Sequence, residues 1–101
     1  MNMLEQLKNA GRVTADKMIG RVILTAYGRE WLTLRDLEAR IYAKYGHGDT
    51  QSAISARIRD IKKQFGTELM LEKRTERINN KTVWFYRVVP APQQSQQKEA
   101  A

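Results

Sequence analysis

Cysteine is absent from this 101-residue chain, and histidine occurs once, at His47. The lack of cysteine excludes disulfides, thiolate nucleophiles and zinc sites of the finger or knuckle type. A single histidine excludes most histidine-rich metal sites as well. The sequence also contains no Ser-His-Asp order, no phosphate-cradling glycine loop and no acidic metal cluster. We therefore expect no catalytic residue, no cofactor and no metal, and we do not expect an enzyme.

Long hydrophobic runs are also lacking. No stretch reaches the roughly 18 apolar residues of a membrane span. Residues 1–11 contain Glu5, Gln6, Lys8 and Asn9, where a secretory signal needs a continuous apolar run. From these two absences we expect an intracellular, cytoplasmic protein.

Acidic residues are the minority among the charged ones. The chain has 18 Lys and Arg against 11 Asp and Glu, which gives a formal net charge of +7. This excess favours a polyanionic partner, because neutralising phosphates releases condensed counterions. Composition alone leaves a membrane surface open as the alternative. Hydrophobic residues make up 42% of the chain, which is enough for one modest core and therefore for one domain.

Apolar residues at helical spacing mark the N-terminal part of the chain. Residues 1–11 form an N-terminal segment that is either a short docking helix or a frayed terminus. From Ala15 to Ala26 the apolar residues recur at i, i+3, i+4 and i+7, which predicts the first core helix. Thr14 is the expected N-cap of this helix and Gly28 its expected stop.

A short glycine-containing turn joins the next two predicted helices. Thr33 caps a helix that Gly46 stops. Asp49 or Thr50 then caps the third core helix, over roughly residues 50–65. The apolar stripe of this third helix consists of Ile54, Ile58, Ile61 and Phe65. Two helices joined in this way form a helix-turn-helix arrangement.

After Gly66 the apolar pattern changes from helical to extended. Residues 69–72 alternate, and residues 82–89 are rich in β-branched and aromatic side chains, which predicts a β-hairpin. Asn79 and Asn80 tolerate the left-handed backbone that a two-residue hairpin turn requires. That turn predicts two cross-strand pairs, Glu72 with Arg87 and Leu71 with Val88.

Two shorter segments complete the predicted organisation. Residues 30–32 are apolar and too short for a helix, so we expect a brief strand there. Residues 90–101 hold two prolines and several glutamines with almost no apolar side chain, which predicts a disordered Pro/Gln-rich tail. The folded domain is then expected over residues 12–89.

The order of helix, short strand, helix, turn, helix and hairpin resembles the winged helix-turn-helix family of DNA-binding proteins over residues 13–89. The segments that carry the resemblance are Trp31-Leu32-Thr33 at the second helix, residues 46–49 in the turn, residues 52–61 in the third helix and Tyr86-Arg87-Val88 in the hairpin. The resemblance implies an α+β winged helix, in which a C-terminal β-hairpin wing follows a three-helix core and the third core helix is the recognition helix. The short basic form also looks similar to small DNA-binding proteins encoded by phages and prophages.

Opposite its apolar stripe, the third core helix carries small and basic residues. Arg59 is the strongest candidate for direct readout, because a guanidinium bonds guanine O6 and N7 together. Gln51 either reads adenine in a similar bidentate way or lies in solvent. The DNA-binding residues predicted on this helix are Gln51, Ser52, Ser55, Ala56, Arg59, Lys62 and Lys63. The competing interpretation is an ordinary solvated helix face.

The predicted wing is also basic. Residues 57–87 hold nine cations against four acids, which accounts for +5 of the net charge of +7. The wing residues predicted to contact the DNA backbone or enter a minor groove are Lys73, Arg74, Arg77 and Lys81. The alternative is an edge strand protected from aggregation by its charges. Glu68, Glu72 and Glu76 count against the wing as a polyanion site.

For the remaining notable side chains we expect structural roles. His47 lies between two glycines and is expected at the surface of a turn. Six aromatic residues are expected in the core or at its rim rather than as base-stacking platforms: Tyr27, Trp31, Tyr42, Tyr45, Trp84 and Phe85.

Together these patterns predict sequence-specific binding of double-stranded DNA by a transcriptional regulator. The third core helix would occupy the major groove and the wing would contact the backbone, so the protein would be nucleoid-associated when bound. Two alternatives stay open, an architectural or accessory DNA-binding protein in recombination or replication, and a winged-helix interaction module that binds an acidic protein partner. A homodimer through residues 1–10 and the first core helix is also compatible with the sequence, whereas no membrane partner is expected.

Overall fold

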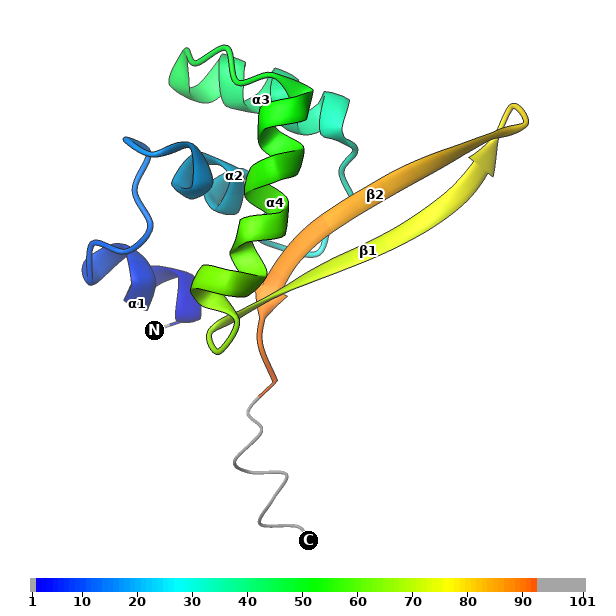
Figure 1. The fold of residues 1–101 in the computed structure, drawn as a ribbon. Helices are drawn as coiled ribbons and strands as arrows, with labels where there is room; N and C mark the ends of the chain where they lie inside the picture. Colours follow the sequence, from blue (N-terminus) through cyan, green and yellow to red (C-terminus); the bar gives the residue numbers. More distant parts are fainter. Residues whose placement is uncertain (1, 93–101) are drawn as a thin grey trace, which may run out of the picture.

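The computed structural model describes residues 2–92 of the chain. Over these residues the fold is α+β, with four helices followed by one antiparallel hairpin (Figure 1). The elements are α1 (Met3–Asn9), α2 (Met18–Ala26), α3 (Leu34–Tyr45), α4 (Gln51–Phe65), β1 (Leu69–Ile78) and β2 (Lys81–Pro90). In the described part of the chain, no helix combines the length and apolar character needed to cross a membrane.

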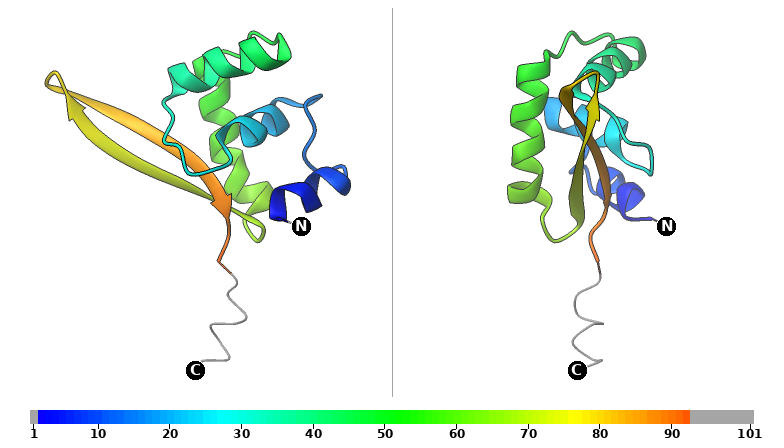
Figure 2. Two further views of the ribbon diagram at one scale, coloured as in Figure 1. Left: turned by 180° about the vertical axis from the view of Figure 1, so that it is seen from behind. Right: turned by 90° about the vertical axis from the view of Figure 1, so that its right-hand side faces the viewer.

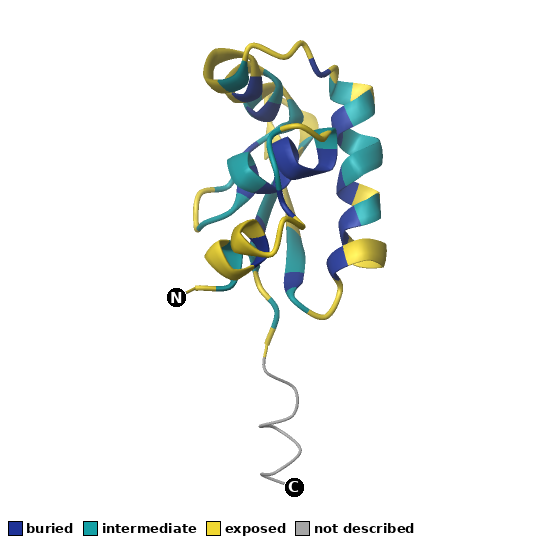
Figure 3. Ribbon diagram, turned by 90° about the vertical axis from the view of Figure 1, so that its left-hand side faces the viewer, coloured by how far each residue is buried: buried dark blue, intermediate teal, exposed yellow. Residues whose placement is uncertain are grey.

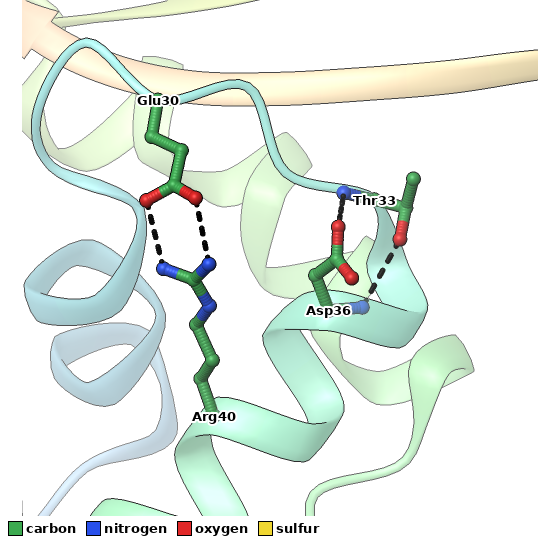
Figure 4. A network of polar contacts seen from close by, with 4 residues as sticks. All are labelled: Glu30, Thr33, Asp36 and Arg40. Atoms are coloured by element: carbon green, nitrogen blue, oxygen red, sulfur yellow. Dashed lines mark hydrogen bonds and ion pairs between the residues drawn. The ribbon is translucent and has the colours of Figure 1, made fainter.

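Local sequence signals set the ends of α3. The Thr33 Oγ1 atom accepts a hydrogen bond from the Asp36 backbone N–H at 3.0 Å, and the Asp36 carboxylate accepts one from the Thr33 N–H at 3.0 Å (Figure 4). This reciprocal capping box satisfies two donors that the first helical turn would otherwise leave free. Gly46 ends the helix in the left-handed region, with φ of 71°. Both expected ends of α3 are therefore confirmed.

The hairpin turn and register also follow the prediction. Asn79 and Asn80 have φ of 51° and 64°, which are the two left-handed residues of a tight hairpin turn. The resulting register pairs Glu72 with Arg87 and Leu71 with Val88. The prediction of the tail beginning at residue 90 is wrong at its first residue, because Pro90 ends β2 opposite Leu69. Residues 91 and 92 follow in neither helix nor strand, and residues 93–101 of the predicted tail lie outside the described residues.

The start of α2 differs from the expectation. The helix begins at Met18 with Lys17 as its N-cap, so Thr14 does not cap it. The chain before Met18 instead folds across the helix, where Gly20 has no side chain. A Cβ atom on Gly20 would lie 1.8 Å from the Thr14 carbonyl oxygen. The apolar spacing from Ala15 onward therefore continues through a segment that is not helical.

The core lies between α2, α3, α4 and the base of the hairpin. The predicted stripe of α4 is buried, and Ile54 and Ile61 are fully inaccessible to solvent. Figure 3 shows buried residues recurring along α4 on the side that faces the other helices. Leu69 and Val88 bring the first residues of β1 and the last residues of β2 into the same core.

The rest of the hairpin projects away from the helical body (Figures 1 and 2). Residues 73–82 are all exposed. A short segment before α3 pairs with β2. The Leu32 N–H donates to the Tyr86 carbonyl at 2.9 Å, and the Tyr86 N–H donates to the Leu32 carbonyl at 2.8 Å. The brief strand expected over residues 30–32 is thus present as a single bridge at Leu32, beside β2.

Candidate nucleic-acid interface

The outer side of α4 carries most of the residues that the sequence singled out. Thr50 caps the helix, since its Oγ1 accepts a hydrogen bond from the Ala53 N–H at 3.2 Å. On the side away from the core lie the exposed residues Ser52, Arg59, Lys62 and Lys63 and the half-buried residues Ser55 and Ala56. The Arg59 side chain leans along the helix, with Nη1 3.5 Å from the Ser55 hydroxyl oxygen.

Gln51 and Asp49 have other partners at the start of this helix. The Gln51 Nε2 atom donates to the Glu38 carboxylate on α3 at 2.8 Å, so its amide holds α3 and α4 together. Asp49 is buried and accepts two hydrogen bonds from the Arg21 guanidinium of α2, at 2.8 and 3.0 Å. These hydrogen bonds raise the pKa of Arg21 against the opposing effect of burial. Of the two capping candidates, Thr50 is therefore the cap and Asp49 anchors the turn.

The four cations predicted on the hairpin lie on two opposite faces of it. Successive residues of a strand point to opposite sides, and cross-strand partners share a side. The observed register therefore places Lys73 and Arg77 on the face that carries Tyr86 and Trp84. Arg74 and Lys81 belong to the other face. The four residues predicted to contact DNA are therefore divided between the two faces of the hairpin.

The acids of the hairpin occupy the face opposite Lys73 and are paired there. Glu72 forms an ion pair with Arg87, and Glu76 forms one with Arg74. Both of these arginines also lie over the Trp31 ring, with guanidinium carbons 4.1 Å (Arg87) and 5.4 Å (Arg74) from its centroid. This arrangement neutralises the two carboxylates and turns them away from the Lys73 face.

Glu68, the third acid in this region, is paired as well. Its carboxylate accepts a hydrogen bond from Arg12 at 2.7 Å, and this contact holds the pKa of Glu68 below its ordinary value. Each of the three glutamates that count against the hairpin as a polyanion site is therefore paired with an arginine.

Between α4 and the Lys73 face of the hairpin the surface is hollowed. A smaller hollow of about 200 Å³ is lined by Ser55, Ile58, Arg59, Lys73, Trp84 and Tyr86. A larger hollow of about 770 Å³ adjoins it toward the base of the hairpin and shares Ile58, Arg59 and Lys73 with it. We call the two hollows together the trough. Lys62 also lines it, and Leu69, Met70 and Leu71 lie along its hairpin side.

The trough is cationic along its rim. Arg59 and Lys62 come from α4 and Lys73 from β1, and none of the three forms an ion pair with a carboxylate of residues 2–92. Tyr86 lines the smaller hollow, and burial raises the pKa of its phenol. The trough therefore combines unpaired positive charge with an apolar and aromatic floor.

Two aromatic residues are not where the sequence placed them. Trp84 is 49% exposed and Tyr42 is 65% exposed, whereas a core or core-rim position was expected for both. Trp84 lies beyond the core because the hairpin extends past it. The predicted register already places Trp84 two residues from Tyr86 on one face, and this was the available signal for its position in the trough. His47 is exposed in its turn, as expected.

In the described part of the chain, no group of three or more His, Cys, Asp or Glu side chains is arranged to hold a metal ion. Comparison of the chain with protein-family models, with curated proteins and with solved structures gives no match. Function is therefore inferred from the chemistry of the trough and of the α4 surface beside it.

Proposed function

We propose that this chain is a winged helix-turn-helix protein that binds double-stranded DNA in a sequence-specific manner and acts as a transcriptional regulator. In this proposal α4 is the recognition helix and the hairpin is the wing. The observation that carries it is the convergence of Arg59 and Lys62 with Lys73 on one surface. Unpaired cations from two separate elements, gathered on one side, match the charge of a phosphate backbone.

The arrangement of the elements supports the winged-helix part of the proposal. A turn over residues 46–50 joins α3 to α4, and the hairpin follows α4 directly. The bridge between Leu32 and Tyr86 adds a short third strand segment beside β2. The order of these elements is the one on which the resemblance to the winged-helix family rests.

The composition of α4 supports its place in a major groove. Ser52, Ser55 and Ala56 are small, so the N-terminal half of the helix can approach base edges closely. Arg59 follows one turn later, exposed and without an ion pair. Its planar guanidinium fits the two acceptors of guanine. Gln51 is left out of the proposed contacts, because its amide donates to Glu38.

The two faces of the hairpin support a one-sided contact. Lys73 and Arg77 lie on the side of the trough, while Glu72 and Glu76 are paired on the other side. A backbone strand beside α4 therefore meets the cations and not the acids. This separation removes the objection that the acidic residues raise at the level of the sequence.

Selection of bound sequences from a random duplex pool, followed by fluorescence anisotropy on the selected duplex, tests the proposal. We expect the selected duplex to bind about 10³-fold or more tightly than a scrambled one at the same salt concentration. Lys8→Ala is the control for every variant that removes a cation from the trough, since it removes one exposed cation from α1, outside the trough. If no duplex binds even at low salt, the proposal is wrong.

A further inference from the structure

Trp84 is exposed where the fold gives it no partner in the core. It lies on β2 opposite Thr75, in the part of the hairpin that projects from the helical body. Nearly half of the side chain is accessible. The ammonium of Lys73 lies 5.9 Å from the centre of its ring. A large aromatic side chain held open beside a cation is a surface on which a second planar group can stack.

The hollow beside Trp84 has the size and lining for one such group. Its volume of about 200 Å³ lies below the roughly 300–1,000 Å³ of pockets that hold drug-sized ligands. Trp84 and Tyr86 form its hairpin side, and Ser55 and Arg59 come from α4. The hollow therefore suits a single planar ring with a polar edge rather than a base pair or a folded peptide.

We propose that the smaller hollow takes one unstacked DNA base, turned out of the double helix, which stacks on Trp84 and presents its polar edge to Arg59 and Ser55. Stacking on an aromatic side chain is open to every base, while the arginine fork favours the two acceptors of guanine. Lys73 supplies the charge for the phosphate of the same nucleotide.

The rest of the trough fits the nucleotides on either side of that base. The larger hollow continues from the smaller one past Arg59 to Lys62, with Leu71 and Met70 along its side. A cationic groove with an apolar or aromatic floor is typical of surfaces that hold unpaired nucleic acid, where the charges follow the backbone and the floor contacts the bases.

This inference rests on the proposed function, because it takes DNA as the ligand. It adds that the base which contacts Arg59 is turned out of the base stack of the double helix. Turning out a base costs the loss of its pairing and stacking, and the cost is smallest where the base has no partner. The protein should therefore prefer a duplex with an unpaired guanine over the same duplex fully paired.

The test uses three DNAs with the full chain: the selected duplex, the same duplex with one extra unpaired guanine at the position that depends on Arg59, and its single strand. We expect the duplex with the unpaired guanine to bind at least about 10-fold more tightly than the paired one, because it avoids much of the few kcal/mol that turning out a paired base costs. In a Trp31→Phe background Trp84 is the remaining tryptophan, and its fluorescence should be quenched by this duplex.

Variants at Trp84 test whether the preference for the unpaired guanine depends on stacking against the Trp84 ring. Trp84→Ala should remove the preference for the unpaired guanine, and Trp84→Phe should keep most of it, because a phenyl ring still stacks. Tyr42→Ala is the matched control, since it removes another exposed aromatic side chain, from α3 and outside the trough. Circular dichroism checks that each variant is folded.

The outcomes separate this inference from the proposed function. Tight binding to the paired duplex without any preference for the unpaired guanine, or a preference that survives in Trp84→Ala, overturns the inference and leaves the proposed function standing. Binding to the DNAs with an unpaired base but to no paired duplex supports the hollow as a base site and contradicts the proposed function. The absence of binding to all three DNAs overturns both.

Discussion

The Arg21 side chain joins three parts of the chain inside the core. Its guanidinium donates to both carboxylate oxygens of Asp49 and, at 2.8 Å, to the Ala15 carbonyl. Arg21 and Asp49 are only 5% and 6% exposed. Because a buried charge is costly without its partner, each residue depends on the other. The pair fixes the turn before α4, and with it the direction in which α4 presents its outer side.

Removing one member of this pair should destabilise the fold strongly. We expect Arg21→Met to lower the free energy of unfolding by about 3–5 kcal/mol, as measured by urea denaturation. The double variant Arg21→Met with Asp49→Leu should recover a large part of the loss, because no buried charge is then left unpaired. The exposed fork between Arg40 and Glu30 (Figure 4) is the control, and Arg40→Met should cost much less. Equal losses at both sites would contradict this assignment.

Arg59 is the residue on which sequence discrimination should depend. We expect Arg59→Ala to reduce the preference for the selected site over a one-base variant by about 5- to 150-fold, because a bidentate contact to guanine is worth roughly 1–3 kcal/mol. Arg59→Lys should not restore it, since an ammonium lacks the planar fork. Competition binding with the two duplexes measures the ratio, with Lys8→Ala as the control. If Arg59→Ala weakens both duplexes equally, Arg59 contacts phosphate instead.

At the scale of the elements, the conformation of the distal hairpin depends on its turn rather than on packing in the core. Asn79 and Asn80 both have positive φ, and residues 73–82 are all exposed. Glycine adopts this backbone without strain, whereas a β-branched side chain does so at a high cost. We expect Asn80→Gly to preserve the hairpin. Asn80→Val should destabilise the hairpin by about 1–2 kcal/mol, the cost of the left-handed backbone, and should speed amide hydrogen exchange over residues 73–84 by the corresponding factor.

The global melting temperature should change little in either variant, because this part of the hairpin does not pack on the helices. DNA affinity should fall for Asn80→Val only, since Lys73 and Arg77 then lose their fixed positions. A large fall in melting temperature for Asn80→Val would mean that the distal hairpin and the helical body unfold together.

Arg12 ties the connection between α1 and α2 to the end of α4. Its guanidinium bonds Glu68 and, at 3.1 Å, the Gln64 carbonyl, and it lies 5.0 Å from the centre of the Phe65 ring. The lowered pKa of Glu68 means that this contact stabilises the fold above the ordinary carboxyl value of 4.5 and is lost as pH falls through the lowered value. Arg12→Ala should therefore destabilise the protein most near neutral pH.

Urea denaturation of the wild type and Arg12→Ala at several pH values checks this expectation. The difference between the two proteins should shrink from about pH 6 to about pH 3, as Glu68 becomes protonated in the wild type. The residual difference at low pH reports the contacts to Phe65 and Gln64. Glu68→Gln should lose the same pH-dependent part, and a gap that stays constant with pH would contradict the role given to Glu68.

At this scale, the sequence predicts features that depend on nearby residues and misses features that depend on contacts between distant parts of the chain. The cap at Thr33 and the turn at Asn79 depend on neighbours within four residues, so the local pattern was sufficient. The start of α2 was missed because it depends on the contact between Thr14 and Gly20, which the apolar spacing does not report. The exposure of Trp84 was missed because it depends on how far the hairpin extends past the core.

The candidate site divides in the same way. The outer side of α4 follows from helical periodicity, since the residues opposite a buried stripe must face outward. The two faces of the hairpin and the pairing of Glu72 with Arg87 follow from the register, yet the ion pair between Glu76 and Arg74 needs the three-dimensional structure. The trough itself requires the angle between α4 and the hairpin, which no local pattern specifies.

At the scale of the whole molecule, cations from α4 and from the hairpin gather on the trough side. Arg59, Lys62, Lys73 and Arg77 face the trough side, and none of them forms an ion pair in residues 2–92. On the other face of the hairpin, Arg74 and Arg87 are neutralised by glutamates, and Lys81 near the turn is the cation of that face without an ion pair in residues 2–92.

This distribution predicts the salt dependence of DNA binding. If Lys62, Lys73 and Arg77 each neutralise one phosphate while Arg59 contacts a base, the logarithm of the binding constant should fall with the logarithm of salt concentration with a slope of about −2.7, since each phosphate contact contributes about −0.9. Changing any one of these three to alanine should reduce the slope by about 0.9 and weaken binding similarly for all sequences. Arg74→Ala, which removes a neighbouring cation from the opposite face, should leave the slope nearly unchanged. Anisotropy titrations over a range of salt concentrations measure both quantities, and equal slopes for Lys73→Ala and Arg74→Ala would show that the two faces of the hairpin do not differ in their contact with DNA.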